Sequence, residues 1–306
     1  MRFGIVGLGR MGGNLARAAM ERGHDVVGYS RDEQTTTELA AEGLEAAPSL
    51  DALVQRLPRP RVVLVYVPHG QPTEDVCEVL RAMLTADDVV VDGGNSHWAD
   101  SQRRHAEFAQ RGIRFLDMGT SGGLWGARHG ACLMAGGDPD AFRMVEPLLH
   151  DLAFDRDAVL FVGVPGSGHF VKLIHNAIEF GMVQAIAEGV ELLTRADYAL
   201  DLPALFDNWN HGSVIRSWLV ELMRDALREN SDLERLSTYV EDTGEVKWVL
   251  AWAQEHDIPS PVISDSQQLL MAYRDLDWPA AKAVALLRRG YGGHAVHHAE
   301  EQLVRS

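Results

Sequence analysis

A glycine-rich turn near the first residue constrains the fold of this chain more than any other feature. Residues 2–6 are largely apolar and predict a buried strand, residues 7–12 have the pattern Gly-x-Gly-x-x-Gly, and residues 14–21 predict a helix. In this setting the first glycine permits a tight turn, the second lets a pyrophosphate approach the backbone, and the third lets the helix pack closely. The amides at the start of the helix then face the phosphates. The pattern predicts a dinucleotide-binding domain of the Rossmann type.

The second expected strand, residues 25–29, ends where the type of dinucleotide is usually read. An acidic residue there binds the ribose hydroxyls of NAD, and it would repel the 2′-phosphate of NADP. This chain has Ser30 at that position, and the guanidinium of Arg31 can donate to a phosphate. NADP is therefore the expected cofactor, while Asp32 leaves NAD open. The expected cofactor contacts are Gly7, Leu8, Gly9, Arg10, Met11, Gly12, Ser30 and Arg31.

Strand-like and helix-like runs alternate through the first half of the chain. The expected strands continue at 61–67, 89–92 and 114–118, and the expected helices lie at 34–42 and 73–84. This alternation predicts a parallel sheet with helices on both faces.

Three loops in this half carry candidate ligand-binding residues. Loops at the carboxyl ends of parallel strands bind ligands, and two of them read Pro68-His69-Gly70 and Asp92-Gly93-Gly94-Asn95-Ser96. A third loop, Ser121-Gly122-Gly123, offers a hydroxyl and backbone amides that could hold a carboxylate. It could equally be a structural turn.

A polar stripe crosses an apolar stretch in the middle of the chain. Lys172, His175, Asn176 and Glu179 are spaced i, i+3, i+4 and i+7. In a helix this spacing puts all four on one face, and the apolar residues around them predict that the helix is buried. The Lys and Glu could be an acid/base pair or an ion pair that holds helices together. A base is favoured because the chain has three lysines against 25 arginines, and Lys, unlike Arg, loses its proton when desolvated.

Charge and cysteine content argue against several classes of protein. The chain has 44 acidic and 28 basic residues, a net charge of −16, which disfavours binding to nucleic acid or to an anionic membrane. Its two cysteines form no CxxC pair, which fits a reducing, cytoplasmic location. Neither a signal peptide nor a membrane span is expected.

Beyond residue 163 glycine becomes scarcer and helix-like stretches take over, at 205–209, 214–227, 245–255, 262–273 and 280–289. The expected fold class is an α/β Rossmann-type doubly wound sheet, residues 1–163, followed by an all-α C-terminal domain for substrate binding and dimerisation, residues 164–306. A substrate would bind between two such domains. The histidine-rich tail lacks a recognisable ligand spacing, so no metal site is expected.

Taken together, the motifs resemble those of decarboxylating 6-phosphogluconate dehydrogenase in its short bacterial form. They are Gly-Leu-Gly-Arg-Met-Gly from residue 7, Asp-Gly-Gly-Asn-Ser from 92, Ser-Gly-Gly-Leu-Trp-Gly from 121, Gly-His-Phe-Val-Lys-Leu-Ile-His-Asn-Ala-Ile-Glu from 168, Asn-His-Gly-Ser-Val-Ile-Arg-Ser-Trp from 210 and Gly-Gly-His near the end. The resemblance covers nearly the whole chain. It implies NADP-dependent oxidative decarboxylation of 6-phosphogluconate to ribulose 5-phosphate and CO2, a reaction of the pentose phosphate pathway.

The resemblance also implies roles for particular residues. Lys172, neutral when substrate is bound, would take the proton of the 3-hydroxyl while C3 passes a hydride to nicotinamide, and Glu179 would protonate the enediol after CO2 leaves. The implied substrate contacts are Asn95, Ser121, Gly122, Gly123, His175, Asn176, Arg288 and His294, and the implied cofactor lining adds Val67, Pro68, His69 and Asn95. Because Arg288 and His294 match tail residues that reach into a partner's site, a homodimer or homotetramer is implied.

Two positions depart from the family pattern. Where a tyrosine next to the catalytic glutamate and an arginine on a later helix are usual, this chain has Phe180 and Leu270. Both changes weaken a phosphate site, although Arg274 lies one turn onward and could substitute. One alternative is a β-hydroxyacid dehydrogenase that acts on an unphosphorylated or differently substituted acid, for which Glu179 has no second proton to deliver. Another is a cofactor-binding protein without turnover.

Overall fold

The computed structural model describes residues 1–229, 240 and 242–273. It divides into two compact units, one made of Met1–Met182 with Gly244–Ser260, the other of Val183–Thr243 with Pro261–Ser306. The fold class is the expected one, a Rossmann-type sheet followed by helices. The boundary expected after residue 163 lies just before helix α8 (Ser167–Thr194), which contributes to both units, and it remains a prediction.

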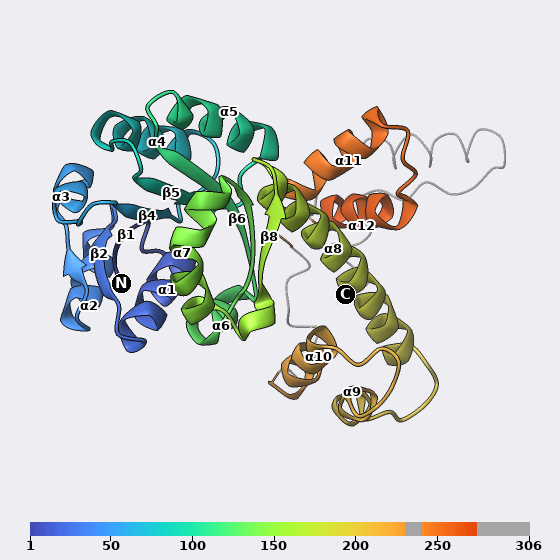
Figure 1. Cartoon of the computed structure of the whole chain (residues 1–306). Helices are drawn as coiled ribbons and strands as arrows, with labels where there is room; N and C mark the ends of the chain where they lie inside the picture. The colour runs from blue at the N-terminus through green and yellow to red at the C-terminus, as the bar shows by residue number, and fades with distance from the viewer. Residues whose placement is uncertain (230–239, 241, 274–306) are drawn as a thin grey trace, which may run out of the picture. The chain divides into compact units, whose positions relative to one another are not determined.

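An eight-stranded sheet forms the centre of the first unit, in the order β3-β2-β1-β4-β5-β6-β7-β8 (Figure 1). The strands are β1 (Arg2–Val6), β2 (Asp25–Tyr29), β3 (Glu45–Ala46), β4 (Val62–Val65), β5 (Val89–Asp92), β6 (Arg114–Ser121), β7 (Cys132–Gly137) and β8 (Val159–Gly163). The chain runs outward from β1 to β3 and then returns to β4 on the other side of β1. The carboxyl ends of β1 and β4 therefore form the switch point at which open α/β sheets bind ligands.

The expected strands pair parallel as predicted, and the one antiparallel pair involves β7, a strand that the sequence pattern did not indicate. β6 and β7 pair antiparallel, whereas every other pair is parallel. The connection between them, residues 122–131, holds only the short helix α6 (Gly123–His129). A parallel crossover needs about a dozen residues or more, so the chain turns back on itself instead.

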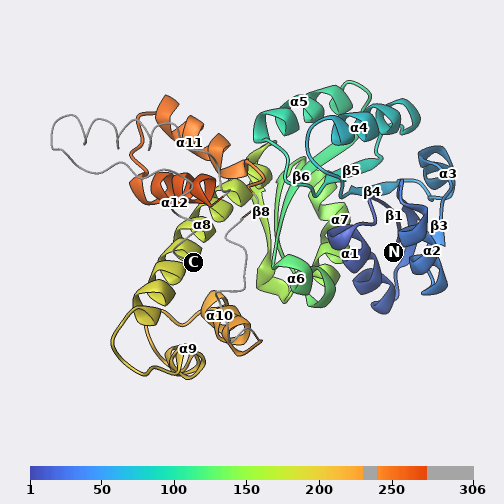
Figure 2. The same cartoon turned by 180° about the vertical axis from the view of Figure 1, so that it is seen from behind.

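Helices cover both faces of the sheet (Figures 1 and 2). One face packs against α1 (Arg10–Glu21), α2 (Glu33–Ala41), α6 and α7 (Pro139–Leu152), and the other against α3 (Leu50–Gln55), α4 (Gln71–Met83) and α5 (Trp98–Ala109). In β5, Val89 and Val91 are buried on the α1 side and Val90 on the α4 side. Burial on both faces explains why these strands are continuous apolar runs.

Helix α11 (Glu245–Glu255) returns to the first unit from a distant part of the chain. Its Val246 and Val249 are buried. Its tryptophans pack edge-on, Trp248 on His69 with ring centroids 5.0 Å apart and Trp252 on Phe170 at 4.9 Å. These contacts tie α11 to the loop after β4 and to α8.

The described part of the second unit is helical. It contains the end of α8 with α9 (Leu202–Asn210), α10 (Trp218–Glu229) and α12 (Pro261–Ala272). Val190, Phe206, Val220 and Leu227 form its described core. The helix expected at 280–289 lies outside the described residues.

The apolar sequence of α8 predicted a helix buried on all sides. The structure shows instead that part of its apolar surface is exposed. Leu173 and Ala177 are buried, but Ile178, Met182 and Val183 are 53%, 44% and 47% exposed. A helix that is apolar on every side needs neighbours on every side. Within the described part of the chain, Ile178, Met182 and Val183 mark a side of α8 that is left partly uncovered.

Candidate active site at the carboxyl edge of the sheet

The geometry at the glycines of the first turn is compatible with the three functions expected of them. Gly7 has a φ of 91°, and a Cβ on it would lie 2.2 Å from the carbonyl oxygen of Tyr66. A Cβ on Gly12 would lie 1.9 Å from the carbonyl oxygen of Gly7, so α1 could not approach with any side chain there. A Cβ on Gly9 would meet nothing within 4 Å. That open space beside the start of α1 fits a pyrophosphate.

The other residues of the turn differ in what they can offer. Arg10 is exposed, and Met11 is partly buried against the core. Leu8 is 1% exposed and its side chain belongs to the core. Only the backbone of Leu8 can therefore face a ligand.

Asp32 is committed to a structural task. Its carboxylate accepts from the backbone N–H of Gln34 at 3.0 Å and from Thr35 Oγ1 at 2.6 Å, which caps α2. Those hydrogen bonds, Thr35 foremost, lower the pKa of Asp32. Ser30 Oγ accepts from the backbone N–H of Asp32 at 3.2 Å, and Arg31 is exposed. Asp32, the residue for which NAD remained a possible cofactor, therefore has its carboxylate engaged at the start of α2.

Helix α8 brings the polar stripe together as the spacing predicted. Lys172 Nζ lies 3.4 Å from His175 Nδ1, and His175 Nε2 lies 3.0 Å from Ser121 Oγ at the end of β6. Glu179 Oε2 lies 3.8 Å from His175 Nδ1. Asn176 is half-buried on the same helix. The Ser121 loop and the stripe of α8 therefore form one polar site.

Burial changes the acid/base properties of this site. Lys172 is 7% exposed, and its removal from water lowers its pKa. The nearby acidic groups of Glu179, Cys132 and Glu245 raise this pKa and so offset part of the effect. The pKa of His175 is lowered as well, mainly by burial and to a smaller extent by the charge of Lys172. A lysine of this kind is more easily deprotonated than a free one, as a base requires.

Asp117 on β6 fixes the start of α8, and sequence reasoning missed it. Its fully buried carboxylate accepts from the backbone N–H groups of Gly166 at 2.7 Å and His169 at 2.8 Å. A Cβ on Gly119 would lie 2.4 Å from Lys172 Cβ, so that glycine lets Lys172 lie directly on the strand. The sequence did contain an indication of this role, because Asp117 is an acidic residue within an otherwise largely apolar strand.

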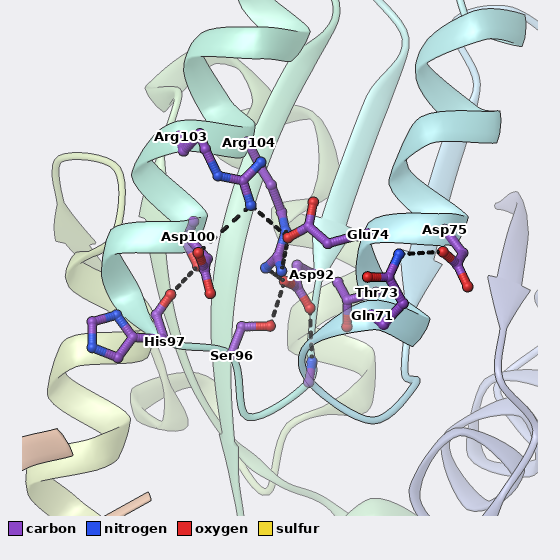
Figure 3. Close-up of polar contacts among 12 residues, drawn as sticks. Gln71, Thr73, Glu74, Asp75, Asp92, Ser96, His97, Asp100, Arg103 and Arg104 are labelled. Carbon is purple, nitrogen blue, oxygen red and sulfur yellow. Dashed lines mark hydrogen bonds and ion pairs between the residues drawn. The ribbon is translucent and has the colours of Figure 1, made fainter.

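A buried ion network shapes the loop that carries Asn95 (Figure 3). Asp92 accepts from the backbone N–H of Gly94 at 3.1 Å, from Ser96 Oγ at 2.9 Å and from Arg104 Nη1 at 3.1 Å. Arg104 is completely buried and also donates to Glu74 of α4 at 2.6 Å. One arginine thus joins β5, α4 and α5 beneath the Asn95 loop.

Asn95 also has a partner in front of the loop. Its Nδ2 donates to Oε1 of Glu245 on α11 at 3.1 Å. The loop after β4 lies beside the same helix through the contact of His69 with Trp248, and Thr73 Oγ1 donates to the carbonyl of Pro68 at 2.9 Å. Glu245 is a second residue that sequence reasoning missed, because nothing in the pattern of α11 indicates its neighbours.

The remaining expected residues are distributed as follows. Gly122 and Gly123 have φ values of 116° and 59° at the start of α6, a conformation that favours glycine. Phe180 is half-buried on α8, and Leu270 is half-buried on α12 of the second unit. Arg274, Arg288 and His294 lie outside the described residues.

No helix among residues 1–229 and 242–273 has the length and apolar character needed to cross a membrane. In the same part of the chain, no three His, Cys, Asp or Glu side chains gather as a metal site would require.

Two family models match the chain. One describes the NAD binding domain of 6-phosphogluconate dehydrogenase and matches residues 2–163, and the other describes the C-terminal domain of that enzyme and matches residues 168–272 and 194–304. A Haloferax volcanii protein named as an NAD(+)-dependent, decarboxylating 6-phosphogluconate dehydrogenase is 38% identical, covering 97% of this chain and 98% of its own. YqeC of Bacillus subtilis, which carries the enzyme's name provisionally, is 42% identical, covering 96% and 99%.

Solved structures share the fold. Plasmodium falciparum 6-phosphogluconate dehydrogenase, described as apo, with NADP+ and with 6-phosphogluconate, has a TM-score of 0.82 at 24% identity, covering 97% of this chain and 66% of that one. Mycobacterium tuberculosis 3-hydroxyisobutyrate dehydrogenase has a TM-score of 0.71 at 22% identity, covering 90% and 96%.

Proposed function

The chain belongs to the 6-phosphogluconate dehydrogenase family, and we propose that it catalyses the NADP-dependent oxidative decarboxylation of 6-phosphogluconate to ribulose 5-phosphate and CO2. One observation carries this proposal: Lys172 and Glu179 lie on one face of α8 with His175 between them. Oxidation of an alcohol followed by protonation of a carbon requires both a base and an acid in one site.

Lys172 takes the proton of the hydroxyl that is oxidised. Its lowered pKa makes the neutral amine more accessible than in a free lysine. His175, 3.4 Å from Nζ, holds the amine toward the Ser121 loop. The nicotinamide of the bound cofactor supplies the hydride acceptor for the same carbon.

Glu179 returns a proton to carbon after the keto acid has lost CO2. The side chain of Glu179 is 45% exposed and that of His175 is 40% exposed, so Glu179 can be reprotonated from solvent between turnovers. A group that both donates and recovers a proton suits the last step of the reaction.

The loops at the edge of the sheet hold the reactants. Ser121, Gly122 and Gly123 offer a hydroxyl and backbone amides to the carboxylate end of the substrate, and Asn95, His175 and Asn176 bind its hydroxyls. The glycine turn, with its open space at Gly9, binds the pyrophosphate. Ser30 and Arg31 favour NADP because Asp32 is engaged in capping α2.

A substrate panel tests the proposal. The purified protein with NADP should turn over 6-phosphogluconate with a kcat/KM at least about 100-fold above that for gluconate, since two or more charged hydrogen bonds of about 1.5 to 3 kcal/mol each are lost without the phosphate. Equal values for the two acids would count against a phosphorylated substrate.

A second candidate function rests on Phe180 and Leu270, which replace two expected phosphate partners, and on the shared fold of 3-hydroxyisobutyrate dehydrogenase. In that case the enzyme oxidises an unphosphorylated or differently substituted hydroxy acid without decarboxylation. Glu179→Gln separates the two. It should lower kcat by about 10²-fold or more for an oxidative decarboxylation, and it should leave a simple alcohol oxidation nearly unchanged.

The proposal extends to assembly and location. The apolar side chains Ile178, Met182 and Val183 on the uncovered side of α8 support a homodimer or homotetramer. The free cysteines Cys77 and Cys132 support a reducing, cytoplasmic compartment.

A further inference from the structure

Glu245 is a buried carboxylate for which the proposed reaction has no role so far. It is 7% exposed and lies in the first turn of α11, after Gly244 with a φ of 92°. A carboxylate is costly to bury unless hydrogen bonds or positive charge compensate it. Here the positive end of the helix and the amide of Asn95, 3.1 Å away, provide both.

Apolar and aromatic side chains dock α11 on the first unit. Val246 and Val249 are buried, Trp248 packs on His69, and Trp252 packs on Phe170. Apolar and aromatic contacts of this kind are sufficient to hold a helix. The carboxylate at the start of this helix is linked to two residues of the polar site, Asn95 and Lys172.

One hydrogen bond and one longer-range charge interaction link Glu245 to that site. Its carboxylate accepts a hydrogen bond from Asn95 Nδ2, so the nitrogen end of that amide faces Glu245. Its charge also acts on Lys172, which is faced by His175 and Glu179 from its own helix and by Cys132 from β7. Glu245 is the acidic group that α11 contributes to this set.

We propose that Glu245 is a positioning residue of the active site: its carboxylate orients Asn95 and supplies from α11 a fixed negative charge opposite Lys172. This inference rests on the proposed function, in which Lys172 is the base and Asn95 a substrate contact. With the charge present, Lys172 holds its proton to a higher pH than burial alone would allow. Glu245 thus sets the pH range in which Lys172 can act.

The test measures Lys172 itself, without turnover. The pH dependence of trace acetylation of Lys172 by acetic anhydride, quantified by peptide mass spectrometry against an added amine standard, reports the titration of its amine. With three lysines in the chain, the Lys172 peptide is readily resolved. Glu245→Gln keeps an oxygen that can accept from Asn95 but removes the charge, so the midpoint should move to lower pH by roughly half a unit or more.

Two further variants make the test specific. Glu255→Gln, the same change at an exposed carboxylate of the same helix, should leave the midpoint where it is in the native protein. Glu245→Asp keeps the charge and should shift the midpoint less than Glu245→Gln does. A midpoint unchanged in Glu245→Gln, or moved equally by Glu255→Gln, would overturn the proposal.

Kinetics with 6-phosphogluconate test the second part of the proposal, the role of Glu245 toward Asn95. The ascending limb of kcat/KM against pH should move to lower pH in Glu245→Gln, and KM should rise about tenfold more in Glu245→Ala than in Glu245→Gln because only the alanine variant releases Asn95. Equal KM values would overturn the role toward Asn95. Absence of turnover in the native protein would instead refute the proposed function, while the acetylation result would still decide the coupling of Glu245 to Lys172.

Discussion

Burial and acidic neighbours act on Lys172 in opposite directions. Removal from water lowers its pKa, and the acidic groups of Glu179, Cys132 and Glu245 partly offset that effect. The net pKa lies below that of a free lysine, and the neutral amine is the form that accepts a proton. We therefore expect kcat/KM to increase as pH rises through this lowered pKa, with the midpoint of the ascending limb below the pKa of an exposed lysine.

Replacing Lys172 tests whether it is the base. Lys172→Met should lower kcat by about 10²- to 10⁴-fold, and Lys172→Arg should do the same because a guanidinium does not deprotonate. NADP binding at the glycine turn should remain, which a fluorescence titration of both variants would show. A Lys172→Met variant that keeps more than about a tenth of native activity would exclude Lys172 as the base.

Individual residues were predictable from the sequence where their neighbours are local. The stripe of Lys172, His175 and Glu179 follows from helical spacing, and the structure has the helix that the spacing requires. Asp117 and Glu245 act on the same site from β6 and α11. Their contacts cross 52 and 150 positions of the chain, and no periodic pattern contains that information.

At the scale of elements, the Asn95 loop depends on a charge cluster beneath it. Arg104 of α5 is completely buried and joins Asp92 at the end of β5 to Glu74 of α4 (Figure 3). Asp92 is buried as well, whereas the side chain of Glu74 is 31% exposed. Asp92 is therefore the group that relies most on Arg104.

Removing Arg104 should destabilise the fold strongly. Arg104→Met leaves the Asp92 carboxylate buried without its cation, which costs about 3 to 5 kcal/mol of unfolding free energy. Arg143→Met is the matched control, because Arg143 is 67% exposed and pairs with Asp140 on the surface of α7. Its effect should stay within about 0.5 kcal/mol. Urea unfolding of both variants measures this, and a loss below about 1 kcal/mol for Arg104→Met would refute the assigned role.

The elements show where sequence patterns stop being informative. The bounds of β1, β2 and β5 match the expected strands because apolar runs between turn residues mark strands well. The direction of β7 was not predictable from its own residues, since it depends on the length of the connection before it. For α11 the pattern gave the helix bounds, but the partner it packs on is decided by aromatic contacts such as Trp248 with His69.

At the scale of the whole molecule, the described site residues expected to do chemistry all belong to one unit. Asn95, Ser121, Lys172 and Glu179 lie within Met1–Met182, and Glu245 joins them through Gly244–Ser260. The acid/base chemistry is therefore assembled by the sheet and the two helices α8 and α11. In the proposed function, the departures at Phe180 and Leu270 would weaken binding of the substrate's phosphate, while Lys172 and Glu179 are retained.

The most direct test of the account is the ratio of CO2 released to NADPH formed when the protein acts on 6-phosphogluconate labelled with carbon-13 at C1. A base and an acid on one face of α8 predict oxidation coupled to decarboxylation, and hence one labelled CO2 for each NADPH. NADPH formed without labelled CO2 would contradict the account and assign the chain to simple hydroxy-acid oxidation.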